Sequence, residues 1–147
     1  MMKEKLQNRL DELLKKTGIT IDENNLDVYE QVIHDRGVSS GYFNIFIEDI
    51  SYMDNYAQMD YIQGQLHGIA NYEKLSDEQK EARHYDVSRH SYLTTLGTWF
   101  GRGELVHLNL DSLNEEELKY FNKGIEVAKE ETLKKEEVSN SKVRIRK

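Results

Sequence analysis

Cysteine and proline are both absent from the 147-residue chain. Without cysteine, the chain can form neither a disulfide framework nor a cysteine-ligated zinc site, which fits a reducing cytoplasm. Because proline interrupts helices, its absence favours long helices over a loop-rich β-sandwich. No apolar run reaches the roughly 18 residues that a membrane-spanning helix needs, and residues 1–16 are charged and unlike a signal peptide. We therefore expect a cytoplasmic protein with no membrane contact.

The length is typical of one domain, and a chain of this size can bury a sufficient hydrophobic core without a disulfide or a metal. The spacing of apolar residues predicts a mainly α-helical fold, a compact bundle of about four to five helices over residues 1–137. Residues 138–147 contain four basic side chains and no acidic one. We expect this segment to form a basic, flexible C-terminal tail.

The first and last helices have the clearest signals. Near the N-terminus, leucines repeat at helical spacing as far as Leu14, and Gly18 follows as a stop signal. Close to the C-terminus, Ser112 and Glu115 have the spacing of a capping box, in which each side chain bonds the other residue's backbone N–H. Apolar residues then recur at helical spacing, so the last helix is predicted to run to about Glu137.

Two further helices are predicted in the middle of the chain. One begins at a second capping-box pattern, Ser76 with Gln79, and continues until a pair of glycines after position 100. The other covers residues 51–72, although Gly64 and Gly68 each weaken it by roughly 1 kcal/mol relative to alanine. Glycines four residues apart also occur where a second helix approaches closely, and this packing role explains why they are tolerated.

Residues 26–50 fit either a helix or a small β-hairpin. Residues 41–47 are rich in β-branched and aromatic side chains, which favours a strand. However, no tight two-residue turn separates two strands, so the helix is the expected conformation.

Negative charge is concentrated in residues 19–73. This segment has ten acidic residues and a single basic one, Arg36, giving −9, whereas the whole chain carries −7. It also contains six of the nine tyrosines. Tyrosine is enriched at protein interfaces, and carboxylates around tyrosines suit a partner with a basic groove. The alternative interpretation is that the tyrosines border the core and the acids only maintain solubility.

Within this segment, a helix continuing through residues 49–60 would bring acids and tyrosines onto one side at steps of three or four residues. The predicted partner-binding residues are Asp49, Tyr52, Asp54, Tyr56, Asp60 and Tyr61.

Metal-dependent or hydrolytic chemistry is the first alternative. Glu81 and His84 have the E-x-x-H spacing of a metal-binding helix, but two-metal bundles need that pattern twice and only one copy is present. The remaining candidates for acid–base chemistry are His34, His67 and His90, with Asp35 or Asp86 as orienting carboxylates. No nucleotide-binding or nucleophile motif accompanies them, so we expect no cofactor and, more simply, no enzyme.

The basic tail is a second candidate contact. Lys142, Arg144, Arg146 and Lys147 could touch phosphates, but no aromatic residue lies among them to stack on bases. We therefore predict at most an auxiliary nucleic-acid contact. The amphipathic first and last helices also permit a homodimeric structural bundle.

Small size, acidity and the absence of motifs are common among phage and mobile-element proteins. The preference for Lys, Asn, Ile, Tyr and Glu is typical of an AT-rich genome and agrees with such an origin. The function expected from the sequence is thus that of a small acidic interaction protein. It would act as an inhibitor or regulator, for example in host defence, by binding a basic surface of a host protein or nucleoprotein complex.

Overall fold

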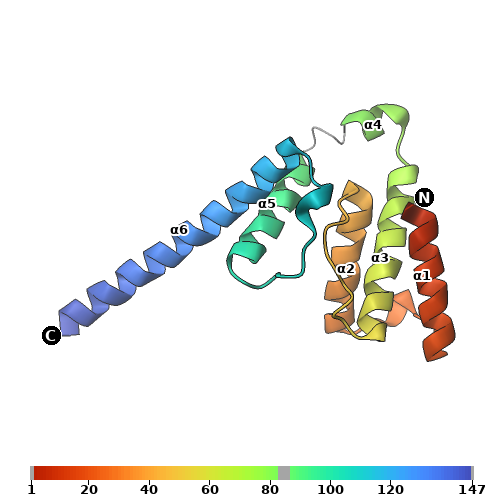
Figure 1. The fold of residues 1–147 in the computed structure, drawn as a ribbon, viewed down its shortest axis with the longest axis horizontal. Coiled ribbons are helices and arrows are strands. Elements are labelled where there is room, and N and C mark those ends of the chain that lie inside the picture. The colour runs from red at the N-terminus through yellow and green to blue at the C-terminus, as the bar shows by residue number, and fades with distance from the viewer. Residues whose placement is uncertain (1, 83–86, 147) are drawn as a thin grey trace. The chain divides into compact units, whose positions relative to one another are not determined.

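The computed structural model describes residues 2–82 and 87–146, with side chains as far as Lys135 (Figure 1). The prediction of a mainly α-helical fold is confirmed. The sequence indicated one domain over residues 1–137, whereas the contacts gather in two compact units, Met1–His84 and Tyr85–Lys147, which we describe one at a time. Among the described residues, no helix combines the length and apolar character needed to cross a lipid bilayer.

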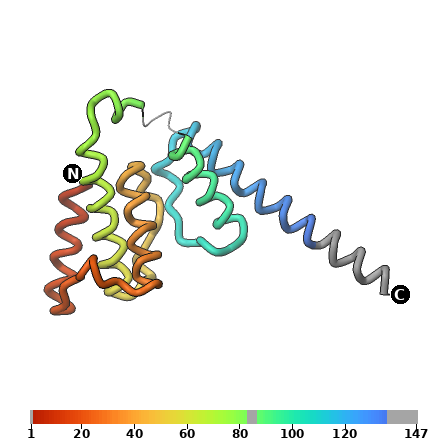
Figure 2. Tube along the Cα trace, turned by 180° about the vertical axis from the view of Figure 1, so that it is seen from behind, coloured from red at the N-terminus to blue at the C-terminus, as the bar shows by residue number. Residues whose placement is uncertain are grey.

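Within residues 2–82, the first unit has four α-helices and a short 3-10 helix. In chain order they are α1 (Met2–Thr17), η1 (Glu23–Asn25), α2 (Val28–Phe43), α3 (Asn55–Glu73) and α4 (Asp77–Ala82). Helix α3 lies between α1 and α2 and packs against both (Figures 1 and 2).

Two hydrophobic clusters hold these three helices together. Apolar side chains of α1 and α3 form the first, which consists of Leu10, Leu13, Met59 and Ile62. The second joins α2 to α3 and consists of Ile33, Ala57 and Tyr61. The leucine repeat near the N-terminus therefore lies on the face of α1 that packs on α3.

Glycines allow α2 and α3 to touch backbone to backbone. A Cβ atom added to Gly37 would lie 2.1 Å from the carbonyl oxygen of Tyr61, and one added to Gly64 would lie 2.1 Å from that of His34. Gly41 and Gly68 are equally close to the opposite helix. The predicted packing role of the paired glycines in residues 51–72 is confirmed. The close approach also brings side chains next to these glycines within reach of one another.

The two helices begin at aspartate caps. Asp27 accepts a hydrogen bond from the backbone N–H of Glu30 at 2.8 Å, and Asp54 accepts one from that of Ala57 at the same distance. The helix expected in residues 26–50 is confirmed by α2, which occupies Val28–Phe43 and ends at Asn44, whose φ of 57° is left-handed. The β-hairpin alternative for these residues is wrong. Helix α3 starts four residues later than predicted, so the segment before Asn55 is not helical.

Capping-box predictions had mixed outcomes. Between Ser76 and Gln79, both reciprocal bonds are present, at 2.9 and 3.2 Å. The predicted box at Ser112 is wrong, because Ser112 belongs to a short 3-10 helix, η3 (Leu110–Ser112). The box instead joins Asn114 and Glu117, with bonds of 2.9 and 2.8 Å.

The second unit is a pair of helices, α5 (Val87–Gly101) and α6 (Glu115–Arg146), with η3 between them in the chain. Glycines again permit backbone contact, since a Cβ on Gly97 would lie 1.9 Å from the carbonyl oxygen of Phe121. The helix predicted from Ser76 onward is described as α4 and α5, and residues 83–86 between them lie outside the described residues. The backbone of α6 is helical to Arg146, where the sequence indicated a flexible tail after residue 137.

Candidate functional site

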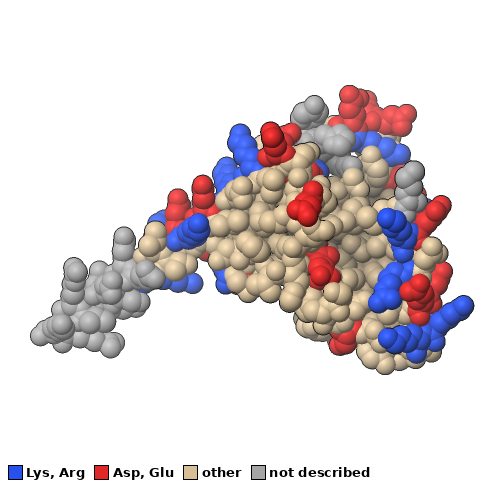
Figure 3. Space-filling model, viewed as in Figure 1, with Lys and Arg blue, Asp and Glu red and all other residues tan. Residues whose placement is uncertain are grey.

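The six predicted partner-binding residues do not form one helical stripe. Asp54, Tyr56 and Asp60 line a pocket of about 430 Å³, whereas Asp49 and Tyr61 line another of about 340 Å³. Tyr52 lies before α3, lines neither pocket and is half exposed. On the face drawn in Figure 3, acidic side chains are scattered, and over α1 they stand beside basic ones. The predicted single acidic face is thus replaced by a local pocket.

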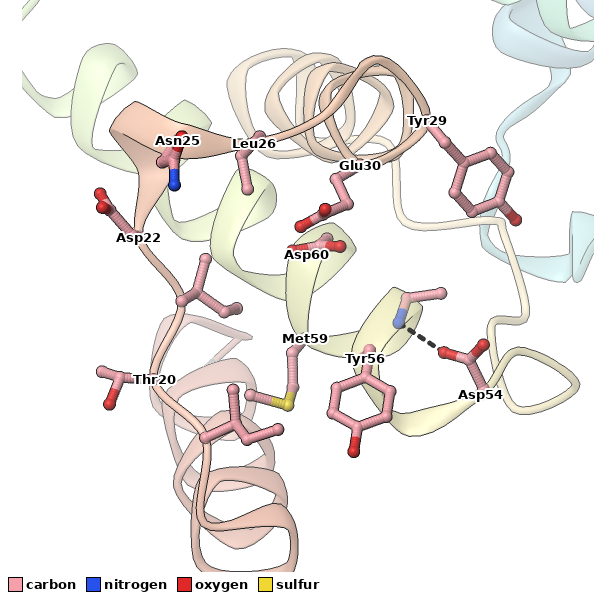
Figure 4. Close-up of a pocket in the computed structure, with 13 residues that line it drawn as sticks. Thr20, Asp22, Asn25, Leu26, Tyr29, Glu30, Asp54, Tyr56, Met59 and Asp60 are labelled. Carbon is pink, nitrogen blue, oxygen red and sulfur yellow. Dashed lines mark hydrogen bonds between the residues drawn. The ribbon is translucent and has the colours of Figure 1, made fainter.

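We call the larger cavity the acidic pocket. It lies between residues 19–26, the first turn of α2 and the first turns of α3 (Figure 4). The residues that line it are Ile19, Thr20, Ile21, Asp22, Asn25, Leu26, Tyr29, Glu30, Asp54, Tyr56, Ala57, Met59 and Asp60. Four of them are acidic and none is basic, so the pocket presents only negative charge to a ligand.

Asp60 is the most perturbed carboxylate of the acidic pocket. Only 4% of the residue is exposed, although it is charged in its ordinary state. Burial raises the pKa of Asp60 to about 6, and repulsion from Glu30, Asp27 and Asp54 adds to the rise. Glu30 on α2 and Asp60 on α3 point toward one another across the pocket (Figure 4). The two helices thus hold together carboxylates that repel each other.

Asp54 and two tyrosines complete the chemical character of the acidic pocket. One carboxylate oxygen of Asp54 caps α3 through the N–H of Ala57, so the backbone fixes the position of this group. Tyr29 and Tyr56 are 71% and 54% exposed, respectively. Their rings can therefore reach an incoming ligand, and their faces attract cations.

The only basic residue of the 19–73 segment does not neutralise this pocket. Arg36 forms an ion pair with Glu48, whose side chain is 3% exposed. The hydroxyl group of Tyr61 donates a 2.9 Å hydrogen bond to the other oxygen of Glu48. Tyr61 itself is 1% exposed, which places it in the core and away from a partner surface. The contact role predicted for Tyr61 has no accessible surface to support it.

A second cluster joins three elements elsewhere in the first unit. Glu23 of η1, His34 of α2 and His67 of α3 each direct a ligand atom toward the others, all within 4.8 Å. The His34 and His67 rings meet edge to face, with their centroids 5.8 Å apart. The sequence named both histidines without pairing them, and no spacing rule linked either to Glu23.

The remaining metal and basic candidates do not assemble into a described site. Glu81 is exposed on α4, and its proposed partner His84 lies outside the described residues. His90 stacks on Tyr120, with ring centroids 4.0 Å apart. The side chains of the tail residues Lys142, Arg144, Arg146 and Lys147 also lie outside the described residues.

Sequence reasoning missed the α2 side of the acidic pocket. Tyr29 and Glu30 were counted in the acidic segment but were not selected, because the stripe of acids and tyrosines was sought only in residues 49–60. The cap signal at Asp27 could have placed both residues in the first turn of a helix.

Comparison of the chain with protein-family models, with curated proteins and with solved structures found no match.

Proposed function

We propose that the chain is an acidic interaction protein whose acidic pocket accepts a basic side chain of a partner protein. The observation that carries this proposal is the convergence of Glu30, Asp54 and Asp60 with two exposed tyrosines in a pocket that has no basic residue. Its volume of about 430 Å³ lies within the range of small-ligand sites and suits one long side chain.

The electrostatics favour a cation over any other ligand. At pH 7, a group with a pKa of about 6 is mostly ionised, so Asp60 presents a carboxylate toward the acidic side chain of Glu30. A guanidinium or ammonium group placed between them would replace repulsion by two charge-assisted hydrogen bonds. The ring of Tyr29 or Tyr56 could then cover the cation. An anionic ligand such as a phosphate would be repelled by the same groups.

The charge of the surrounding segment supports a protein partner with a basic surface. Residues 19–73 carry −9, which would accelerate the encounter with a positively charged groove, most strongly at low salt. Such grooves commonly bind nucleic acid, so occupation by this protein would block them. We therefore propose an inhibitor or regulator of a host protein or nucleoprotein complex, with a phage or mobile element as its proposed origin.

Short synthetic peptides test the proposal directly. Isothermal titration calorimetry would compare a peptide containing two arginines with a neutral peptide of equal length. We expect only the basic peptide to bind, and its affinity to fall as salt rises from low to physiological concentration. Glu30→Gln and Asp60→Asn should each weaken binding by about tenfold or more, because each removes one partner of a desolvated charge pair.

The variants and their control are chosen to preserve the fold. Asp54→Asn retains a good helix cap, so it separates the charge of Asp54 from its structural role. Glu78→Gln removes one charge from the exposed surface of α4 and should leave affinity within about twofold. Equal losses for Glu78→Gln and Glu30→Gln would show that only net charge matters and would contradict a specific pocket. No binding of the basic peptide at low salt would also reject the proposal.

A further inference from the structure

Both ring nitrogens of His34 on α2 are buried and have no hydrogen-bond partner in the described part of the chain, and the residue is only 6% exposed. Oε1 of Glu23 beside it is also buried and lacks a partner there. Buried polar atoms nearly always have a partner, because leaving one unpaired costs free energy. Nε2 of His34 and Oε1 of Glu23 face each other, so one ligand placed between them would satisfy both atoms.

We propose that Glu23, His34 and His67 bind one divalent transition-metal ion of the zinc type. Nε2 of His34 lies 3.6 Å from Oε1 of Glu23, and Nδ1 of His67 lies 3.7 Å from Oε2 of the same carboxylate. Both distances are too long for good hydrogen bonds. In a tetrahedral site with bonds near 2.1 Å, neighbouring ligand atoms are about 3.4 Å apart. These two separations are close to that value, and one ligand atom from each of the three residues lies within 4.8 Å of the others.

The fold supplies the ligands from three separate elements. His34 is held on α2, and its backbone carbonyl is in contact with Gly64 of α3, one turn before His67. Glu23 enters from the short helix η1, which the side chain of Asp22 caps through the N–H of Asn24. Because α2 and α3 meet backbone to backbone, the two imidazoles are positioned by the helix pair. A bound ion would tie residues 19–27 to this pair.

The donor set selects the class of metal. Two imidazole nitrogens and one carboxylate suit zinc and its neighbours, whereas magnesium and calcium prefer oxygen ligands. Three protein ligands leave a fourth position for water or an exogenous ligand. The side chain of His67 is 45% exposed, so that edge of the cluster faces solvent. Nδ1 of His34 lies 3.9 Å from Oδ1 of Asp35, a carboxylate that would orient the ring once the opposite nitrogen binds metal.

Zinc binding by the full-length, tag-free chain tests this proposal. Competition with a chromophoric zinc chelator should reveal one equivalent of bound Zn²⁺, and an excess of Mg²⁺ should not displace it. Glu23→Gln and His67→Gln should each weaken binding by at least about tenfold, since even residues that merely support a metal ligand have effects of that size. Both side chains are partly exposed, so these variants are expected to fold.

A matched substitution distinguishes this cluster from adventitious binding. His107→Gln removes an exposed histidine of the second unit and should leave zinc affinity unchanged. As a second readout, Zn²⁺ should raise the thermal midpoint of the wild-type chain and of His107→Gln, but not that of His67→Gln. Loss of zinc affinity in His107→Gln together with full affinity in His67→Gln would overturn the assignment. Absence of zinc binding by the wild-type chain would overturn it as well.

Discussion

Replacing Asp60 with asparagine should stabilise the protein at neutral pH while it weakens the binding of a basic peptide. In the native state, Asp60 is 4% exposed and pairs with no basic side chain among the described residues. The ionised carboxylate of Asp60 therefore has a higher free energy in the folded chain than in the unfolded chain, and it destabilises the fold. Asparagine has nearly the same shape, carries no charge and can donate a hydrogen bond to Glu30.

The magnitude follows from the raised pKa. A rise from 3.8 to about 6 corresponds to roughly 3 kcal/mol, because one pKa unit equals about 1.4 kcal/mol. Since Asp60 lines an open pocket, solvent will screen part of this effect, and we expect a gain of about 1–3 kcal/mol at pH 7.5. Because the folded-state pKa of Asp60 is raised, folding favours the protonated side chain, and its contribution to the free energy of unfolding is fully present below pH 3.8. It is lost as the pH rises through about 6.

The assay is urea unfolding followed by far-UV circular dichroism for wild type and Asp60→Asn between pH 4 and pH 7.5. The difference in the free energy of unfolding should be small at pH 4 and reach its maximum near pH 7. Other titrating groups contribute equally to both proteins and cancel in the difference. Fluorescence of the single tryptophan, Trp99 in α5, reports on the second unit and should not change. A difference that is constant across this pH range would refute the reasoning.

Packing and ion-pair substitutions supply the remaining predictions, each measured by urea unfolding at pH 7. Gly97→Ala should cost more than about 3 kcal/mol, because its Cβ would lie 1.9 Å from a backbone oxygen of α6. Gly101→Ala, whose Cβ would lie 2.8 Å from a methyl group of α6, should cost about 1 kcal/mol. Tyr61→Phe should cost about 1.5 kcal/mol through loss of its hydrogen bond to Glu48. Arg36→Met should cost about 3–5 kcal/mol, because the carboxylate of Glu48 would remain buried without its partner.

Three results would contradict these expectations. Equal costs for the two glycine substitutions would mean that the α5–α6 contact is looser than described. A stability of Arg36→Met equal to that of wild type would mean that Glu48 is hydrated in solution. An unchanged free energy of unfolding for Tyr61→Phe would mean that the hydrogen bond from the Tyr61 hydroxyl to Glu48 does not stabilise the fold.

The local signals in the sequence predicted the helices well. Two of these signals, the leucine repeat before Gly18 and the box of Ser76 and Gln79, involve residues within one to four turns of the same helix. Such patterns act before the chain has folded, so they can be found without a tertiary structure. The errors at Ser112 and at the start of α3 are errors of boundary. In each case the predicted helix began at a serine two to three residues before the residue that caps it, Asn114 or Asp54.

The candidate sites could be predicted only in part. The sequence located the excess of acids in residues 19–73 and selected three residues that line the acidic pocket. It placed Asp49, Tyr52, Tyr56 and Asp60 on one side because it extended a helix back to Asp49, whereas α3 begins at Asn55. Whether an aspartate is exposed or buried depends on which helix covers it. The raised pKa of Asp60 is therefore a property of the packing of α2 against α3.

By itself, the sequence determined that the chain is helical, acidic in one segment and free of cysteine chemistry, because composition and periodicity are properties of the chain alone. Only the tertiary structure decided which charged groups meet. Glu30 and Asp60 are 30 positions apart, and Glu23 and His67 are 44 positions apart, so no local pattern connects either pair. Glycines on α2 and α3 let the two backbones touch, and both the acidic pocket and the histidine cluster combine side chains of this helix pair with residues 19–26.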